Sequence, residues 1–137
     1  MAHLVYHKYL ETEIRTADPV KLVCMLYQAA IEAVGSARRH LQAGAIRERS
    51  RQISRAMGIL IQLTRSLDQG RGRDISCSLA NLYVYMQRRL MEANARQIDA
   101  PLAEVERLLT TLLTAWSALP TSPPPAIAAY APVSCTG

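Results

Sequence analysis

The sequence lacks phenylalanine, and one tryptophan and six tyrosines are the only aromatic residues among its 137. A core without phenylalanine has to be built from leucine, isoleucine, methionine and alanine. These residues suit helices better than sheets, which favour aromatic and β-branched side chains. The length allows one domain with a single modest core. The composition therefore predicts a small all-α domain.

The sequence also lacks the motifs of catalysis. It has no glycine-rich phosphate loop, no HExxH and no GxSxG. Its three histidines are His3, His7 and His40, and a His3–His7 pair near a chain end is more often solvated than metal-bound. Di-iron bundles need Glu-x-x-His pairs, which are missing. We therefore expect no enzyme activity, no metal and no cofactor.

Cys24, Cys77 and Cys135 show no CxxC spacing, which gives no support for a zinc module or a disulfide scaffold. We expect Cys24 and Cys77 to be free, as in a reducing compartment. The N-terminus does not resemble a signal peptide, and no apolar run approaches the roughly 20 residues that span a bilayer. We expect a soluble cytoplasmic protein with no membrane partner.

The net charge of +5 and the pI near 9.4 raise the question of nucleic acid. Seven arginines lie between Arg47 and Arg73, against two acidic residues, Glu48 and Asp68. A nucleic-acid-binding surface would place such charges on one face with aromatic or amide side chains among them. The arginines from Arg47 to Arg55 take mixed angular positions with no aromatic residue between them. A solvated arginine-rich surface is the favoured interpretation, without a nucleic-acid partner.

Four helices are predicted along the chain. Asp18 can cap the first, Pro19 suits its first position, and Gly44 can end it in a left-handed conformation. The others are expected at about residues 46–69, 74–96 and 99–119, with Asp99 as the cap of the last. Their inward rows include Ile46, Ile75 and Leu119. The short connections predict an antiparallel up-down four-helix bundle.

Two segments flank the predicted bundle of residues 17–119. Residues 1–16 are too apolar for a free tail and too short for a domain, so we expect them to pack on the bundle as a capping segment. Residues 120–137 are rich in proline and alanine and carry no charge. We expect this stretch to be a disordered tail.

The helices carry more apolar side chains than a bundle core requires, which is about three positions in seven. The stretch MGILIQL, residues 57–63, spreads them around more than half the circumference, and RLLTTLLTAW, residues 107–116, repeats the pattern. Tyr83 and Tyr85 lie off the main stripe of their helix. Periodicity alone does not separate an apolar groove from a well-filled core.

Three blocks of the sequence resemble a known family. Tyr9, Thr16-Ala17-Asp18-Pro19, Leu22 and Met25-Leu26-Tyr27 resemble the opening of the flagellar secretion chaperones, the FliS family. NLYVYMQRRLMEAN, residues 81–94, is similar to the family's Leu-Tyr-x-Tyr-Met-x-x-Arg-Leu signature with its closing Ala-Asn. EVERLLTTLLTAW, residues 104–116, is similar to its last helix, which ends on tryptophan. The resemblance covers about residues 6–119, but the basic pI departs from a mostly acidic family.

The resemblance implies a cytoplasmic export chaperone that binds the disordered C-terminal region of flagellin, prevents premature polymerisation and aids flagellar type III secretion. It also implies that the N-terminal segment, with Tyr9 and Leu10, covers part of the binding site. Helix phase and resemblance together predict a flagellin-binding groove formed by Leu26, Ile53, Met57, Leu60, Tyr83 and Met86. The flagellar export apparatus or a co-chaperone is a second candidate partner. We expect a monomer or a weak homodimer.

Two alternatives of other classes stay open. One is a basic nucleic-acid-associated bundle that uses the Arg47–Arg73 stretch, and the other is a homodimeric structural bundle that seals its own apolar surface. Salt separates the first from a chaperone, because phosphate-driven binding falls steeply as salt rises. Dilution separates the second, because a self-sealing dimer loses stability when it dissociates.

Overall fold

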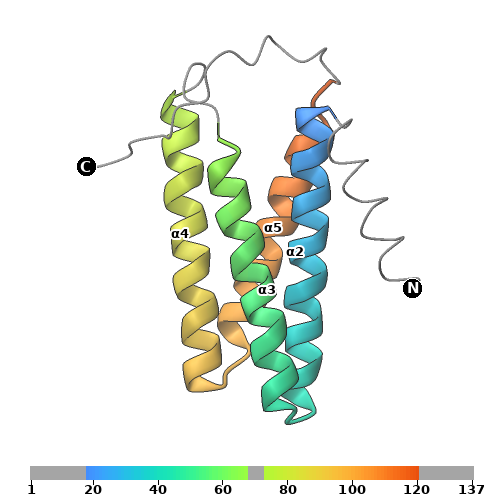
Figure 1. The fold of residues 1–137 in the computed structure, drawn as a ribbon, viewed down its shortest axis with the longest axis vertical. Coiled ribbons are helices and arrows are strands. Elements are labelled where there is room, and N and C mark those ends of the chain that lie inside the picture. The colour runs from blue at the N-terminus through green and yellow to red at the C-terminus, as the bar shows by residue number, and fades with distance from the viewer. Residues whose placement is uncertain (1–17, 68–72, 121–137) are drawn as a thin grey trace.

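The fold is an all-α, antiparallel four-helix bundle (Figure 1), as the sequence predicts. The computed structural model describes residues 18–67 and 73–120, and these contain no strand. The helices are α2 (Pro19–Gln42), α3 (Ile46–Arg65), α4 (Arg73–Arg96) and α5 (Ala100–Ser117). They form a ring in which α2 packs on α3 and α5, and α4 packs on α3 and α5. The predicted cap, with Tyr9 and Leu10, and residues 121–137 of the predicted tail lie outside the described residues.

The ends of α2 follow from the local sequence. The Asp18 carboxylate accepts a hydrogen bond of 3.0 Å from the Val20 amide, which satisfies one of the free donors of the first turn. At the other end Gly44 has φ of 72°, a region that costs glycine nothing. The Ala45 amide then returns to the His40 carbonyl at 2.9 Å, as in a Schellman cap. Both predicted signals are confirmed.

Two other helix ends differ from prediction. The α3 helix ends at Arg65 rather than near Gln69. There the Ser66 hydroxyl donates to the Leu63 carbonyl at 2.8 Å and occupies an acceptor of the last turn. Asp99 precedes α5, but its side chain makes no capping hydrogen bond. Its carboxylate instead accepts two hydrogen bonds from the Arg38 guanidinium, at 2.8 and 2.9 Å. A bidentate ion pair to α2 has replaced the predicted cap.

The core runs through the centre of the ring. Its fully buried side chains include Tyr27 and Val34 of α2, Leu60 of α3, Leu90 of α4 and Leu109 of α5. Three residues that the sequence assigned to inward rows are exposed, namely Ile46, Ile75 and Leu119. Each lies in the first turn of a helix or beyond the last one. A neighbouring helix does not cover a side chain there, so these three assignments were wrong.

The α2 helix is long and apolar enough, by length and composition, to cross a membrane. The expectation that no stretch approaches this length is therefore wrong. The core helix of a soluble bundle has the same composition, and α2 buries Tyr27, Ala30, Ala33, Val34 and Ala37 between α3 and α5. Packing in this bundle accounts for its apolar character.

Candidate docking surface

Three aromatic residues from separate blocks of the sequence meet in the core. Tyr27 of α2 and Tyr83 of α4 lie with their hydroxyl oxygens 2.6 Å apart. The Tyr27 ring also lies 6.4 Å from Trp116 of α5, tilted by 58°. Tilted ring pairs at this separation are favourable beyond the area they bury. The expectation that Tyr83 lies off the inward stripe is wrong, because it is 1% exposed.

The two tyrosines are held in their neutral form. Burial raises the pKa of Tyr27 far above its ordinary value, and the hydrogen bond with Tyr83 raises it further. Burial also raises the pKa of Tyr83. A buried hydroxyl that keeps its proton at neutral pH is poorly suited to act as a general base. The pair joins α2 to α4 across the core.

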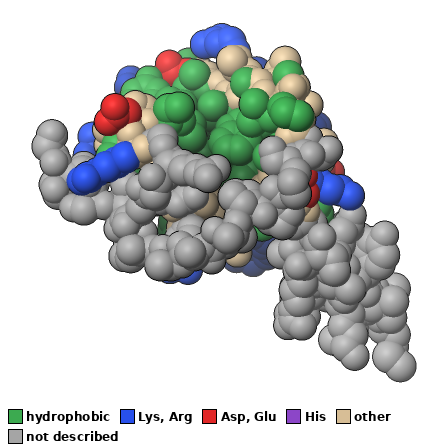
Figure 2. Space-filling view, turned by 90° about the horizontal axis from the view of Figure 1, so that it is seen from above, with side chains coloured by type: hydrophobic (Ala, Val, Ile, Leu, Met, Phe, Trp, Pro, Cys, Tyr) green, Lys and Arg blue, Asp and Glu red, His purple; other side chains and the backbone are tan. Residues whose placement is uncertain are grey.

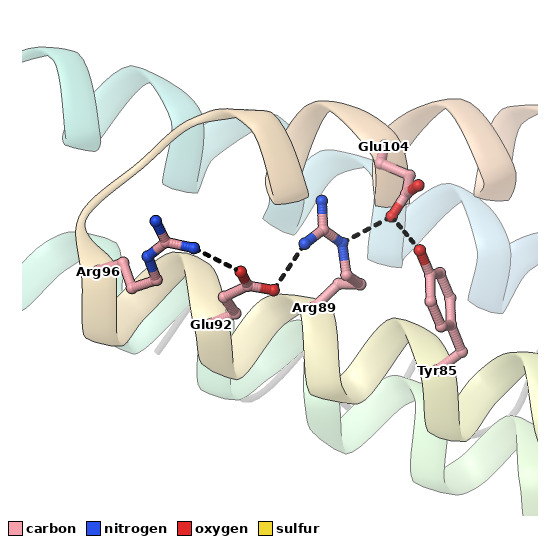
Figure 3. Close-up of polar contacts among 5 residues, drawn as sticks. All are labelled: Tyr85, Arg89, Glu92, Arg96 and Glu104. Atoms are coloured by element: carbon pink, nitrogen blue, oxygen red, sulfur yellow. Dashed lines mark hydrogen bonds and ion pairs between the residues drawn. The ribbon is translucent and has the colours of Figure 1, made fainter.

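A second set of signature residues forms a chain of polar contacts on the surface between α4 and α5 (Figure 3). The Glu104 carboxylate accepts hydrogen bonds from the Tyr85 hydroxyl and from Arg89 Nε, both at 2.7 Å. Arg89 also donates to Glu92 at 2.6 Å, and Glu92 accepts from Arg96 at 2.9 Å. The hydrogen bonds from Tyr85 and Arg89 hold the pKa of Glu104 below its usual value. Arg89 and Glu92 are three positions apart, a spacing that brings two side chains together on one side of a helix.

A third polar contact joins the start of α3 to the end of α4. The Asn94 side-chain oxygen accepts from Arg49 Nε at 3.1 Å and from the Ser50 hydroxyl at 3.0 Å. Asn94 lies two residues before the end of α4 at Arg96. Polar residues of the 81–94 stretch therefore join α4 to α3 and to α5.

The six residues predicted for the groove are placed mostly inside the bundle. Ile53, Leu60, Tyr83 and Met86 are buried in the core, whereas Leu26 and Met57 are partly buried and pack against it. A partner can therefore contact these four buried side chains only if the helices of the bundle separate. Their role in flagellin binding stays a prediction. The apolar stretch of residues 57–63 is largely used by the core, since Leu60 and Leu63 are fully buried and Met57 and Ile59 partly so.

An apolar pocket of about 250 Å³ opens at the end of the bundle where α2 and α4 begin and α3 and α5 end. Figure 2 looks onto this end and shows hydrophobic side chains gathered there. Its lining includes Val20, Val23, Leu67, Leu79, Tyr83 and Trp116. Among the predicted groove residues, Tyr83 alone reaches this pocket. The pocket is large enough for one or two apolar side chains, not for a whole helix.

Large apolar side chains are also exposed on the face formed by α3 and α4. Ile61 of α3 is 41% exposed, and Val84 and Met91 of α4 are 43% and 58% exposed. Sequence reasoning noted Ile61 as surplus but missed Val84 and Met91. They lie off the stripe of Met86 and Leu90, and an isolated apolar residue outside a stripe gives no signal of its own.

The described residues offer little for metal or thiol chemistry. Within residues 18–67 and 73–120, no three His, Cys, Asp or Glu side chains gather into a possible metal site. Cys24 is free. Cys77 is disulfide-bonded, so the expectation of a free thiol there is wrong.

Comparison with known proteins places these features in a family. The family model described as "Flagellar protein FliS" matches residues 1–122. The chain is 36% identical over 108 residues to the flagellar secretion chaperone FliS of Salmonella typhimurium, covering 78% of this chain and 80% of that protein. It is 33% identical over 110 residues to FliSB of Pseudomonas aeruginosa, covering 80% and 87%. It is 30% identical over 111 residues to FliS of Bacillus subtilis, covering 81% and 82%.

Proposed function

This chain belongs to the FliS family of flagellar secretion chaperones, and we propose that it binds the C-terminal region of flagellin in the cytoplasm. Bound in this way, flagellin cannot polymerise early and stays fit for flagellar type III secretion. Family membership is the observation that carries the proposal. The names of the relatives are those of chaperones, which also favours a binding protein over an enzyme.

The surface chemistry of the described residues is consistent with a binding protein of this kind. A disordered segment gains affinity by laying an apolar helix face into an apolar groove, and it loses ordering entropy when it does so. The exposed side chains Ile61, Val84 and Met91 offer such a face without any opening of the bundle. The half-buried Met57 beside them has the flexible side chain that accommodates an imperfectly repeating ligand.

The four buried groove residues contribute to binding only if helices separate. We propose that Leu26, at the edge of the core, joins Met57 at the contact, whereas Ile53, Leu60, Tyr83 and Met86 act mainly by holding the bundle together. Tyr9 and Leu10 remain the proposed cap. Deletion of residues 1–16 should then raise the affinity for flagellin, and an unchanged affinity would contradict a capping role.

The test is co-purification with flagellin from the same organism, either complete or lacking its last few dozen residues. Complete flagellin should be recovered with the chaperone, and the truncated form should not. Equal recovery of both forms contradicts the proposal. Two measurements address the alternatives: retention on single-stranded DNA that falls steeply with salt would favour nucleic acid, and a dimer that unfolds on dilution would favour a self-sealing bundle.

A further inference from the structure

Several apolar side chains lie along the face between α3 and α4, namely the exposed Ile61, Val84 and Met91 and the half-buried Met57, and we call this set the strip. The Asn94 contacts with Arg49 and Ser50 fix how the two antiparallel helices are aligned. Met57 and Ile61 lie two and three turns after Ser50 on the same side of α3. This alignment places Ile61 opposite Val84, which with Met91 lies on the side of α4 turned toward α3. The two helices lie side by side in Figure 1.

Small residues flank the strip on the α3 side. A side chain added at Gly58 would meet no atom within 4 Å, and Ser54 lies one turn before it and is exposed. Glycine inside an exposed helix costs about 1 kcal/mol relative to alanine, so it needs a compensating role. Open space over Gly58 allows a second helix to approach the α3 backbone closely.

Arginines border this strip on both helices. Arg47, Arg51, Arg55 and Arg65 of α3 and Arg88 of α4 are exposed. Arg49 lies on a different face of α3, where it is buried and bonded to Asn94. In the part of the chain that the structure describes, Arg51 pairs with Glu48 at 3.5 Å, and the other four make no ion pair. The apolar side chains of the strip are therefore bordered by exposed arginines, most of which make no ion pair within the described residues.

We propose that this arginine-bordered strip docks an amphipathic helix of flagellin whose apolar row is flanked by aspartate and glutamate. The inference rests on the proposed function and adds the charge pattern that the bound segment must have. The distance from Arg47 to Arg65 corresponds to about 27 Å of helix at 1.5 Å per residue, enough for a docked helix of about five turns. Charge complementarity favours acidic residues on both sides of the apolar row of the bound helix, because basic residues there would be repelled by the arginines.

The apolar floor favours a peptide over nucleic acid. Single strands bind through aromatic side chains between basic residues, and Tyr85, the exposed tyrosine of α4, is hydrogen-bonded to Glu104 on the side that faces α5. A polynucleotide would leave Ile61, Val84 and Met91 without an apolar partner. Binding of an oligonucleotide to this face is therefore an outcome that contradicts the proposal.

The experiment measures the affinity of the full chain for the C-terminal segment of its flagellin by calorimetry. The variant Arg47→Glu/Arg88→Glu reverses one charge on each border of the strip. The control Lys21→Glu/Arg39→Glu makes the same change in net charge on α2, where both side chains are exposed. At low salt the border variant should bind at least about tenfold more weakly, and the control should stay within about twofold. The difference should shrink as salt is raised, because exposed charges are screened.

Two further binding measurements complete the experiment. Gly58→Trp fills the open space above α3 and should weaken binding by at least about tenfold while circular dichroism stays helical. A flagellin segment with asparagine and glutamine in place of its aspartate and glutamate should bind the wild type and the border variant equally.

If the wild type binds flagellin and the border variant binds as tightly, this inference is wrong and the proposed function stands. If the wild type does not bind flagellin, the proposed function is wrong. If the border variant loses affinity for a single-stranded oligonucleotide instead, the face binds nucleic acid.

Discussion

The Tyr27 hydroxyl lies 2.6 Å from the Tyr83 hydroxyl, and the two side chains are 0% and 1% exposed. The two residues come from separate blocks of the sequence that resemble the family. Their contact gives the tyrosine hydroxyl a role at both positions, since each hydroxyl provides the buried partner of the other. Tyr83, which belongs to the stretch that resembles the family signature, therefore contributes to the stability of the bundle.

Replacement of one tyrosine should therefore cost more than the loss of one hydroxyl suggests. Tyr83→Phe leaves the Tyr27 hydroxyl without its partner, and the free energy of unfolding should fall by about 1–3 kcal/mol. The double variant Tyr27→Phe/Tyr83→Phe should lose less than the sum of the two single variants, because it leaves no buried hydroxyl behind. Urea unfolding of all four proteins measures this coupling. Additive losses would show that the hydroxyls are not coupled.

The same pair should make the fold sensitive to alkali. Folding raises the pKa of both groups, so the folded state keeps protons that the unfolded state loses above about pH 10. The contribution of the pair to stability should be fully present below that value and should be lost as pH rises past it. Unfolding free energies measured from pH 8 to about pH 11 should decline more steeply for the wild type than for the double phenylalanine variant. Parallel declines would contradict this prediction.

The Glu104 contacts should make stability depend on pH in the acidic range. Hydrogen bonds from Tyr85 and Arg89 lower the pKa of Glu104 in the folded state. This contribution to stability is fully present above the unfolded value of about 4.3 and is lost as pH falls through the folded value. Glu104→Gln should therefore reduce stability at pH 7, and the difference from the wild type should disappear at low pH.

Glu32→Gln is the matched control, because Glu32 is exposed on α2 and makes no hydrogen bond or ion pair within the described residues. That variant should match the wild type across the whole pH range. A pH-independent loss for Glu104→Gln would mean that packing of the side chain, and not its charge, matters.

The sequence predicted the fold where local chemistry decides the outcome. Asp18 with Pro19 begins α2, and Gly44 ends it, because the backbone there needs a side-chain acceptor and then a positive φ. It did not predict Asp99 correctly. A carboxylate before a helix is an effective cap only if no stronger donor competes, and the competing donor, Arg38, lies on another helix. Such a contact is not visible before the helices are packed.

The candidate site was harder to predict for a related reason. In helices with apolar residues around most of the circumference, periodicity does not fix which side faces the core. Leu60 and Tyr83 were therefore assigned to a groove although they are buried, whereas Val84 and Met91 were overlooked although they are exposed. The position of a helix in the ring decides between core and surface, and that position depends on all four helices at once.

Two glycines should respond in opposite ways to the same change. Gly44 has φ of 72°, so Gly44→Ala forces a side chain into a strained backbone conformation and should lower stability by about 1 kcal/mol. Gly58 lies inside α3 with open space around it, so Gly58→Ala should raise stability by about 0.5–1 kcal/mol. Thermal unfolding of the two variants beside the wild type tests both. Stabilisation by Gly44→Ala, or destabilisation by Gly58→Ala, would contradict the local geometry.

Adjacent residues of α3 should separate folding from binding. Leu60 is fully buried, so Leu60→Asp places an unpaired charge in the core and should unfold the protein. Ile61 is 41% exposed, so Ile61→Asp should leave the helical circular dichroism spectrum intact. It should weaken flagellin binding by at least about tenfold, because apolar contact is lost and the new charge repels acidic residues of the bound helix.

Ile75→Asp is the control, because Ile75 is exposed at the end of the bundle beside the pocket. It should bind flagellin as the wild type does. Loss of binding with Ile75→Asp but not with Ile61→Asp would place the contact at the pocket instead of the α3–α4 face.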